Sequence, residues 1–113
     1  MHVEEQIESG VAVVSLKGDF VGNDDEFELQ QKIISLKSDG ITRVVVDLGK
    51  VNRINSRGLS ALISAVKTMR TAGGDVRIAR IDRHLNDILG KTRLVQVFDT
   101  YETVGRALAS YTQ

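Results

Sequence analysis

The sequence contains no cysteine, no proline and no tryptophan, and only 4% of its 113 residues are aromatic. The absence of cysteine excludes disulfide bonds, thiolate metal ligands and cysteine nucleophiles. The absence of proline leaves the predicted helices without the residue that interrupts helices most strongly. No apolar run is long enough to span a bilayer, and Met1–Glu5 lacks the basic start and apolar core of a secretion signal. We therefore expect a cytoplasmic protein without membrane insertion.

Neither sign of charge is in excess, because 15 lysines and arginines face 15 aspartates and glutamates. A neutral chain has no long-range field that favours nucleic acid or an anionic membrane. One stretch is rich in basic residues but has no interleaved aromatic residue on which bases could stack. It consists of Arg77, Arg80, Arg83, Lys91 and Arg93. We interpret it as a solvated face and expect no nucleic-acid partner.

With 113 residues and 42% apolar content, the chain can bury one modest core, so residues 1–113 are predicted to form a single domain. Short apolar runs alternate with segments of helical periodicity, which predicts an α/β fold. We expect a mixed, mostly parallel sheet of four to five strands with about four helices.

The predicted strands begin with an antiparallel hairpin of Val3–Ile7 and Val11–Leu16, in which Gly10 supplies the positive φ of the turn. Val3–Ile7 is expected at the edge of the sheet. Val44–Val46 is β-branched throughout and bounded by turn residues, which predicts a central strand. Val76–Ala79 is a further short strand, and Leu94–Phe98 stays ambiguous.

The predicted helices are amphipathic. The first follows Gly22-Asn23, where acidic residues suit a helix N-terminus, and it ends at Asp39-Gly40. Its buried half is expected to contain Phe27, Leu29, Ile33, Ile34 and Leu36. The second follows Ser56, ends at Gly73-Gly74 and should bury Leu59, Leu62, Ile63, Val66 and Met69. A helical turn over His84–Leu89 and a closing helix marked by Val104, Ala107, Leu108 and Tyr111 complete the pattern.

Ser56 is the candidate regulated residue, because it stands alone where a strand gives way to a helix. As an N-cap, its side-chain oxygen would accept a hydrogen bond from a backbone N–H two or three residues on. A phosphate at this position would meet unpaired N–H groups and the positive end of the helix dipole, so the fold could carry it. Such a charge would therefore act on a partner rather than on folding.

The two residues after Ser56 each leave two roles open. Gly58 lacks a Cβ, which serves either tight packing of helix against strand or close approach of a partner. Arg57 is either a solvated side chain or a guanidinium that holds a phosphate or an acidic partner group.

Other chemistry is weakly supported. His84 lies near Asp82 and Asp87, but no metal-ligand spacing accompanies it, so we expect no metal site. Residues around Ser56 lack the G-x-S-x-G pattern of a hydrolase, and no glycine-rich run matches a nucleotide-binding loop. We expect a binding module with no cofactor and no enzymatic activity of its own.

The order of these predicted elements and the residues around Ser56 resemble the STAS-domain family, in particular the bacterial anti-sigma factor antagonists. The likeness covers nearly the whole length: the hairpin, Leu16-Lys17-Gly18-Asp19-Phe20 before an acidic helix start, Val44-Val45-Val46-Asp47-Leu48 before Ser56, and Gly73-Gly74 before another strand.

The resemblance implies a partner switch. Unphosphorylated protein would bind an anti-sigma factor that is a serine kinase, and so release a sigma factor. Phosphorylation of Ser56 would block binding, and a metal-dependent phosphatase of the PP2C type would restore it. The implied partner surface comprises Asp19, Val21, Gly22, Asn23, Asp24, Asn55, Arg57, Gly58, Leu59 and Ser60.

Departures from the family pattern surround the acceptor. The turn typically reads Asp-Ser-Ser-Gly-Leu in that family, whereas Asn55 and Arg57 flank Ser56 here. Val21 also stands near the position of a loop acid. A specialised kinase could carry an acid that meets Arg57. The alternative to the switch is a constitutive scaffold or an accessory subunit of a larger assembly, including one for lipid transport.

Overall fold

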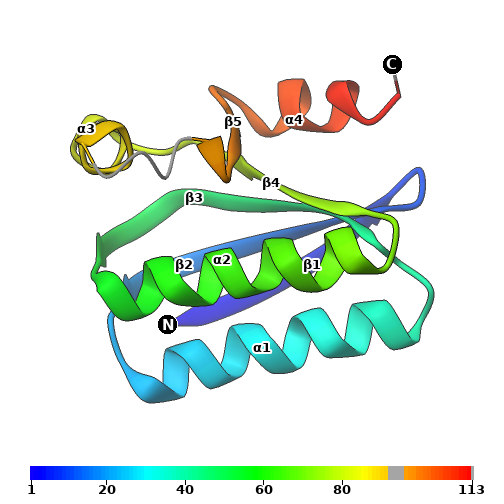
Figure 1. Ribbon diagram of the computed structural model, residues 1–113, viewed down its shortest axis with the longest axis horizontal. Helices are drawn as coiled ribbons and strands as arrows, with labels where there is room; N and C mark the ends of the chain where they lie inside the picture. Colours follow the sequence, from blue (N-terminus) through cyan, green and yellow to red (C-terminus); the bar gives the residue numbers. More distant parts are fainter. Residues whose placement is uncertain (92–95, 113) are drawn as a thin grey trace.

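The computed structural model describes residues 1–91 and 96–112, and its elements are arranged as Figure 1 shows. The strands are β1 (His2–Glu8), β2 (Val11–Phe20), β3 (Arg43–Ile54), β4 (Asp75–Ala79) and β5 (Asp99–Tyr101). The helices are α1 (Asn23–Ser38), α2 (Ser56–Thr71), α3 (Arg83–Lys91) and α4 (Val104–Ser110).

The five strands form one sheet in the order β1-β2-β3-β4-β5. β1 and β2 are antiparallel, and the β2–β3, β3–β4 and β4–β5 pairs are parallel. The hairpin turn contains two positive φ values, 51° at Ser9 and 81° at Gly10, where one glycine was predicted. The mixed α/β fold, the opening hairpin and the edge position of β1 are confirmed.

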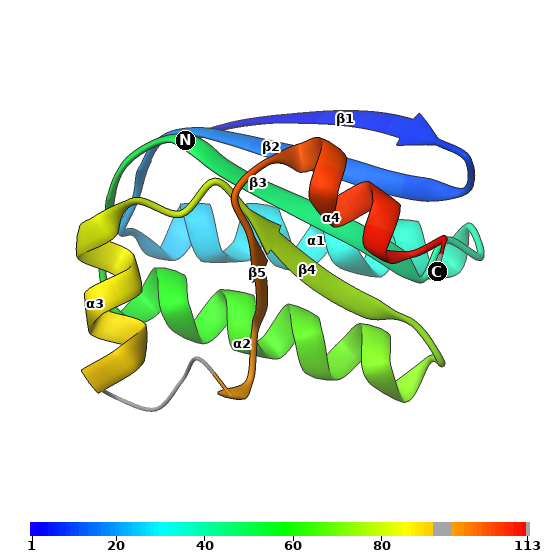
Figure 2. The same ribbon diagram turned by 90° about the horizontal axis from the view of Figure 1, so that it is seen from above.

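The helices cover the two faces of the sheet unequally (Figures 1 and 2). α1 and α2 lie side by side on one face and cover the main core of alternating strand residues such as Val14, Val46 and Ile78. α4 lies on the opposite face and packs Ala107 against Val45 in a smaller cluster. Because α4 is short, it leaves part of that face over β1, β2 and the second half of β3 uncovered (Figure 2).

Several details differ from the sequence predictions. Phe27 and Ile34 are 61% and 51% exposed, because only one stripe of α1 (Leu29, Ile33 and Leu36) faces the sheet. β3 does not end after Val46 but continues to residue 54, paired with the equally extended β2. β5 is a strand that periodicity did not locate, since three residues are too few for a pattern. Residues 94 and 95 of the ambiguous segment lie outside the described residues.

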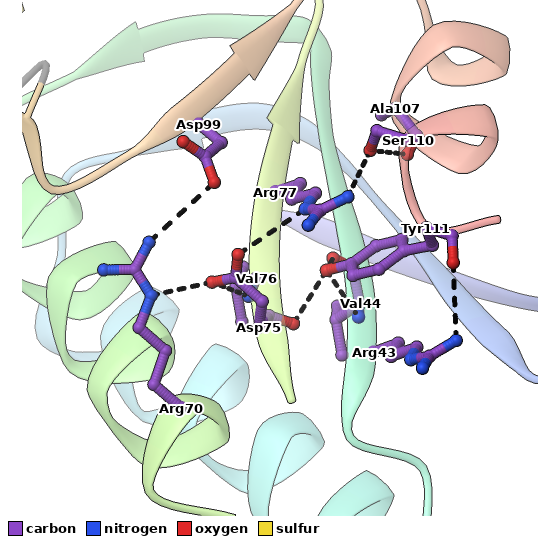
Figure 3. A network of polar contacts seen from close by, with 10 residues as sticks. All are labelled: Arg43, Val44, Arg70, Asp75, Val76, Arg77, Asp99, Ala107, Ser110 and Tyr111. Atoms are coloured by element: carbon purple, nitrogen blue, oxygen red, sulfur yellow. Dashed lines mark hydrogen bonds and ion pairs between the residues drawn. The ribbon is translucent and has the colours of Figure 1, made fainter. Parts of the chain in front are cut away.

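A polar network fastens the C-terminal helix to the sheet (Figure 3). The Tyr111 hydroxyl lies 2.7 Å from the Val44 carbonyl oxygen and 2.9 Å from that of Asp75, and accepts from the Val44 N–H at 3.3 Å. The Arg77 guanidinium lies 4.0 Å from the centroid of the Tyr111 ring and donates to Ser110 Oγ at 2.5 Å. Arg77 is thus a structural residue, not part of a solvated basic face.

Among the described residues, no helix is both long and apolar enough to cross a membrane.

Candidate functional site

Two chain junctions meet at one end of the sheet, β2 to α1 and β3 to α2. They are neighbours because β2 and β3 run parallel and end in register, with Phe20 opposite Ile54. Both helices then turn back over the same face of the sheet (Figure 1). We call the surface formed by residues 19–26 and 53–60 the junction surface. Its predicted members are thus brought together by strand pairing, although they lie more than 30 residues apart in sequence.

Asn55, not Ser56, is the N-cap of α2. Its Oδ1 accepts hydrogen bonds from the N–H groups of Arg57 at 3.1 Å and Gly58 at 3.2 Å. Its Nδ2 donates to the Val21 carbonyl oxygen at 2.9 Å, which joins the two junctions directly. An aspartate could cap the helix but could not donate to that carbonyl. The asparagine that departs from the family pattern therefore has a structural role here.

Ser56 is the first helical residue and its side chain is exposed. Within residues 1–91 and 96–112, its hydroxyl makes no hydrogen bond, so the prediction that it caps the helix is wrong. The cap residue must precede the first helical residue, and Asn55 occupies that position, where its side chain accepts from the free N–H groups. A phosphate on Ser56 would consequently find the Arg57 and Gly58 N–H groups already bonded to Asn55.

Gly58 is buried where α2 crosses the ends of β2 and β3. A Cβ at this position would lie 2.6 Å from Ile54 Cγ1 and 2.7 Å from the Phe20 carbonyl oxygen. Both separations are well inside contact distance, and one neighbour is backbone. Of the two roles left open by the sequence, the structure supports tight packing.

Arg57 is bonded within the chain rather than free. Its Nη1 donates to Asn23 Oδ1 and lies 3.8 Å from Glu26 Oε2. A cation in the first turn of a helix opposes the helix dipole, and the Glu26 carboxylate offsets that charge. The Arg57 side chain remains 54% exposed, so a neighbouring anion could still reach it. Glu26 is a member of this surface that sequence reasoning missed, because only the tertiary structure shows that its carboxylate lies near Arg57.

Asp25 braces the turn before α1. Its Oδ2 accepts from the N–H groups of Val21 at 3.3 Å and Gly22 at 3.2 Å, and the Met1 ammonium lies 3.2 Å from Oδ1. Burial raises the pKa of Asp25, but the Gly22, Met1 and Val21 donors outweigh burial and hold the pKa below its usual value. An acid at the third helical position is the sequence signal for such a brace.

At the rim of the junction surface, Arg53 Nη2 donates to Asp19 Oδ2 at 2.8 Å across the β2–β3 pair. The Arg53 side chain is 73% exposed and that of Asp19 is 39% exposed, so water screens this ion pair and it adds little stability. It orients two opposite charges beside the start of α2.

Residues 2–107 match the model of the STAS domain family. The chain belongs to the STAS domain family. It is 22% identical over 102 residues to a Bordetella bronchiseptica protein named as the anti-sigma factor antagonist BtrV, covering 90% of this chain and 87% of that protein.

Solved structures share the STAS fold of this chain. An anti-sigma factor antagonist from Mycobacterium paratuberculosis matches with a TM-score of 0.85 and 23% identity, covering 99% of this chain and 94% of that one. Phosphorylated SpoIIAA of Bacillus matches with a TM-score of 0.75 and 12% identity, covering 97% and 99%. A murine anion transporter of the solute carrier 26 family contains the fold in 18% of its chain, with a TM-score of 0.76, 17% identity and 92% coverage of this chain.

Three further predicted members of the junction surface, Asp24, Leu59 and Ser60, make no side-chain hydrogen bond or ion pair among the described residues. Asp24 and Ser60 are exposed, and Ser60 lies one helical turn after Ser56 on the same side of α2. Leu59 is half-buried and packs against the main core. Asp24 and Ser60 are therefore available to a partner, whereas part of Leu59 is not.

His84 lies at the start of α3, where it and Asp82 line a hollow of about 240 Å³ against the end of β3. The Asp82 carboxylate accepts from the Leu85 N–H at 2.7 Å, so it is occupied in capping α3. The described residues contain no group of three or more histidine, cysteine or acidic side chains placed to hold a metal.

Proposed function

We propose that this STAS domain is an anti-sigma factor antagonist in a phosphorylation-controlled partner switch. The unphosphorylated junction surface binds an anti-sigma factor that is a serine kinase, and a sigma factor is released. Phosphorylation of Ser56 prevents that binding, and a phosphatase of the PP2C type removes the phosphate. The names of the similar proteins support the antagonist role, and the phosphorylated SpoIIAA structure supports the modification.

One observation carries the proposal: the Ser56 hydroxyl is exposed and unbonded, while the side chains on either side of it, Asn55 and Arg57, are bonded within the chain. Asn55, not Ser56, holds the helix start. A phosphate, which adds about −1.5 to −2 charges, would therefore change the surface potential while the packing beneath it stays intact. A reversible binding switch requires a hydroxyl that can be modified without disturbing the packing around it, and Ser56 meets that requirement.

The Arg57 side chain gives the phosphorylated state a second effect. A phosphate on the preceding residue would compete with Glu26 and Asn23 for the guanidinium. Capture of Arg57 would leave the Glu26 carboxylate without its cation. The phosphate makes the junction surface more negative, and the move of Arg57 leaves the net charge unchanged but exposes the Glu26 carboxylate, so an acidic partner group is repelled at two places.

The first test is the phosphosite map of the protein isolated from its own cells in two growth states, with Ser56→Ala as the control. We expect a growth-dependent phosphate on Ser56. In the second test, tagged wild-type, Ser56→Ala and Ser56→Asp proteins are compared for co-isolation of a serine kinase. Ser56→Asp should weaken that complex more than about tenfold, because like charges brought together cost several kcal/mol.

Ser35→Asp is the matched control, because Ser35 is exposed on α1 far from the junctions and receives the same charge. It should leave kinase binding unchanged. Equal binding by Ser56→Asp and wild type, together with no phosphate on Ser56, would instead indicate the constitutive scaffold. The transporter structure makes that alternative concrete, since it contains the same fold within a larger protein.

A further inference from the structure

The uncovered part of the α4 face of the sheet contains a row of basic residues. Side chains of β1 and β2 alternate, so His2 and Lys17 point to this face while Val3 and Leu16 pack in the main core. His2 is paired with Lys17, and Lys17 is paired with Lys50 of β3. Each of three neighbouring strands thus contributes one basic residue, and the three residues lie side by side.

A β-bulge in β3 creates the lysine pair. The register runs from Ser15 opposite Asp47 to Lys17 opposite Lys50, so β3 has one residue more than β2 in this interval. Without that residue, Gly49 would face Lys17, and Lys50 would point into the core. Leu48 and Val51 both pack against the main core, as the bulge requires. Bulges re-aim side chains and are common beside functional sites.

Arg80 completes the group from the end of β4. Its Nε and Nη2 each donate to an Asp47 carboxylate oxygen at 2.8 Å, and Asp47 also accepts from the Gly49 N–H at 2.9 Å. The guanidinium lies over Gly49, where a Cβ would come within 2.4 Å of its Cζ. Arg80 adopts φ +59°, a strained value for a residue with a side chain. The Arg80 backbone conformation and the absence of a Cβ at Gly49 together hold the Arg80 guanidinium in this position.

A hollow of about 100 Å³ lies among these side chains, and we call it the lysine pocket. Its lining includes His2, Lys17, Asp47, Lys50 and Arg80. One water needs about 10–15 Å³ of such space, so the hollow has room for one small oxyanion. In the described part of the chain, Lys17 and Lys50 make no salt bridge or side-chain hydrogen bond. Two carboxylates also line the hollow: Glu4, whose Oε1 lies 3.2 Å from His2 Nε2, and Asp47, which is bonded to Arg80. Like charges directly opposite one another destabilise a sheet, and the Asp47 carboxylate, which attracts Lys50, is already bonded to Arg80, so the two lysines are not fully neutralised within the chain.

We propose that the lysine pocket binds a single phosphate-type oxyanion, either the free ion or the end group of a small phosphorylated molecule. Lys17 and Lys50 hold the anion from neighbouring strands, and the Nη1 of Arg80, which Asp47 leaves unoccupied, donates from the third side. Asp47 fixes the guanidinium and does not contact the anion. The site lies on the face opposite α2 and is independent of the Ser56 switch.

The test is a titration of the ¹⁵N-labelled protein with inorganic phosphate at neutral pH, with sodium chloride at matched ionic strength as the reference. Saturable shifts are expected at the amides of Lys17, Gly49 and Lys50 with phosphate alone. Lys17→Gln and Lys50→Gln should each weaken binding about two- to fivefold, the change that loss of one exposed charge pair produces. The double variant should show no saturation, and Lys17→Arg should bind as wild type does.

The matched control is the Lys37→Gln, Lys67→Gln double variant, which loses the same net charge from exposed positions on α1 and α2. It should bind phosphate as wild type does. Glycerol 3-phosphate, tested in parallel, distinguishes a free ion from a phosphorylated small molecule by which ligand binds more tightly. Shifts that stay linear and coincide with those in chloride, or equal affinity of the two double variants, would overturn the proposal.

Discussion

Replacing Gly58 by alanine sets two opposing effects against each other at the start of α2. In a helix, alanine is favoured over glycine by about 1 kcal/mol. The new Cβ, however, would lie 2.6 Å from Ile54 Cγ1, about 1 Å inside carbon–carbon contact. Overpacking of this kind costs about 1–3 kcal/mol, and the upper part of that range, about 2–3 kcal/mol, applies here because the Phe20 backbone cannot rotate away. We therefore expect a net loss of about 1–2 kcal/mol of unfolding free energy.

The assay is denaturant and thermal unfolding followed by far-UV circular dichroism. A loss of about 1–2 kcal/mol should lower Tm by roughly 5–10 °C in a domain of this size. Gly90→Ala is the matched control, because Gly90 is in helix α3 and a Cβ added there would meet no atom within 4 Å. That substitution should raise stability through helix propensity alone. A Gly58→Ala protein as stable as wild type would refute tight packing and return Gly58 to a role in partner access.

Three further outcomes are expected. Asn55→Ala should lower the unfolding free energy by about 1–3 kcal/mol, measured in urea, because it loses a helix cap and an inter-junction hydrogen bond. Burial raises the pKa of Asp47, but Arg80 holds it below its ordinary value of 3.8, so its contribution to stability is present above pH 4 and is lost as pH falls through the folded-state pKa. Asp47→Asn should therefore destabilise at pH 7 and flatten the acid limb of the stability curve; an unchanged limb would contradict the assignment. Burial raises the pKa of Tyr111, so an ultraviolet titration should show one of the two tyrosines ionising only on alkaline unfolding, and Tyr111→Phe should remove that step while weakening the hold of α4 on Val44.

Local pattern was sufficient for most of the architecture. Alternation in β1 and β2, the β-branched run at Val44–Val46 and the helical stripe of α2 each repeat within a few residues, so the sequence alone carries them. The family resemblance, confirmed by the STAS match, rests on the same local segments. In α1, the buried face was predicted to be too wide, because Phe27 and Ile34 are exposed, but the helix itself was predicted correctly.

The lower predictability of the junction surface has a physical cause. Ser56 was found as an exposed serine at a helix start, but the cap belongs to Asn55, since the exact first residue of a helix depends on which side chain reaches the free N–H groups. The partners of Arg57 are on α1, more than 30 residues away. No local periodicity records such a contact.

By itself, the sequence determined the α/β class, the opening hairpin, the two long helices and the position of Ser56 at a strand-to-helix junction. Only the tertiary structure decided that Ile54 and Phe20 occupy the space beside Gly58 and that Arg57 is paired with Glu26. It also decided that a bulge turns Lys50 toward Lys17. The reason is that periodicity reports which face a residue occupies, whereas strand register and helix crossing fix which distant side chains meet on that face.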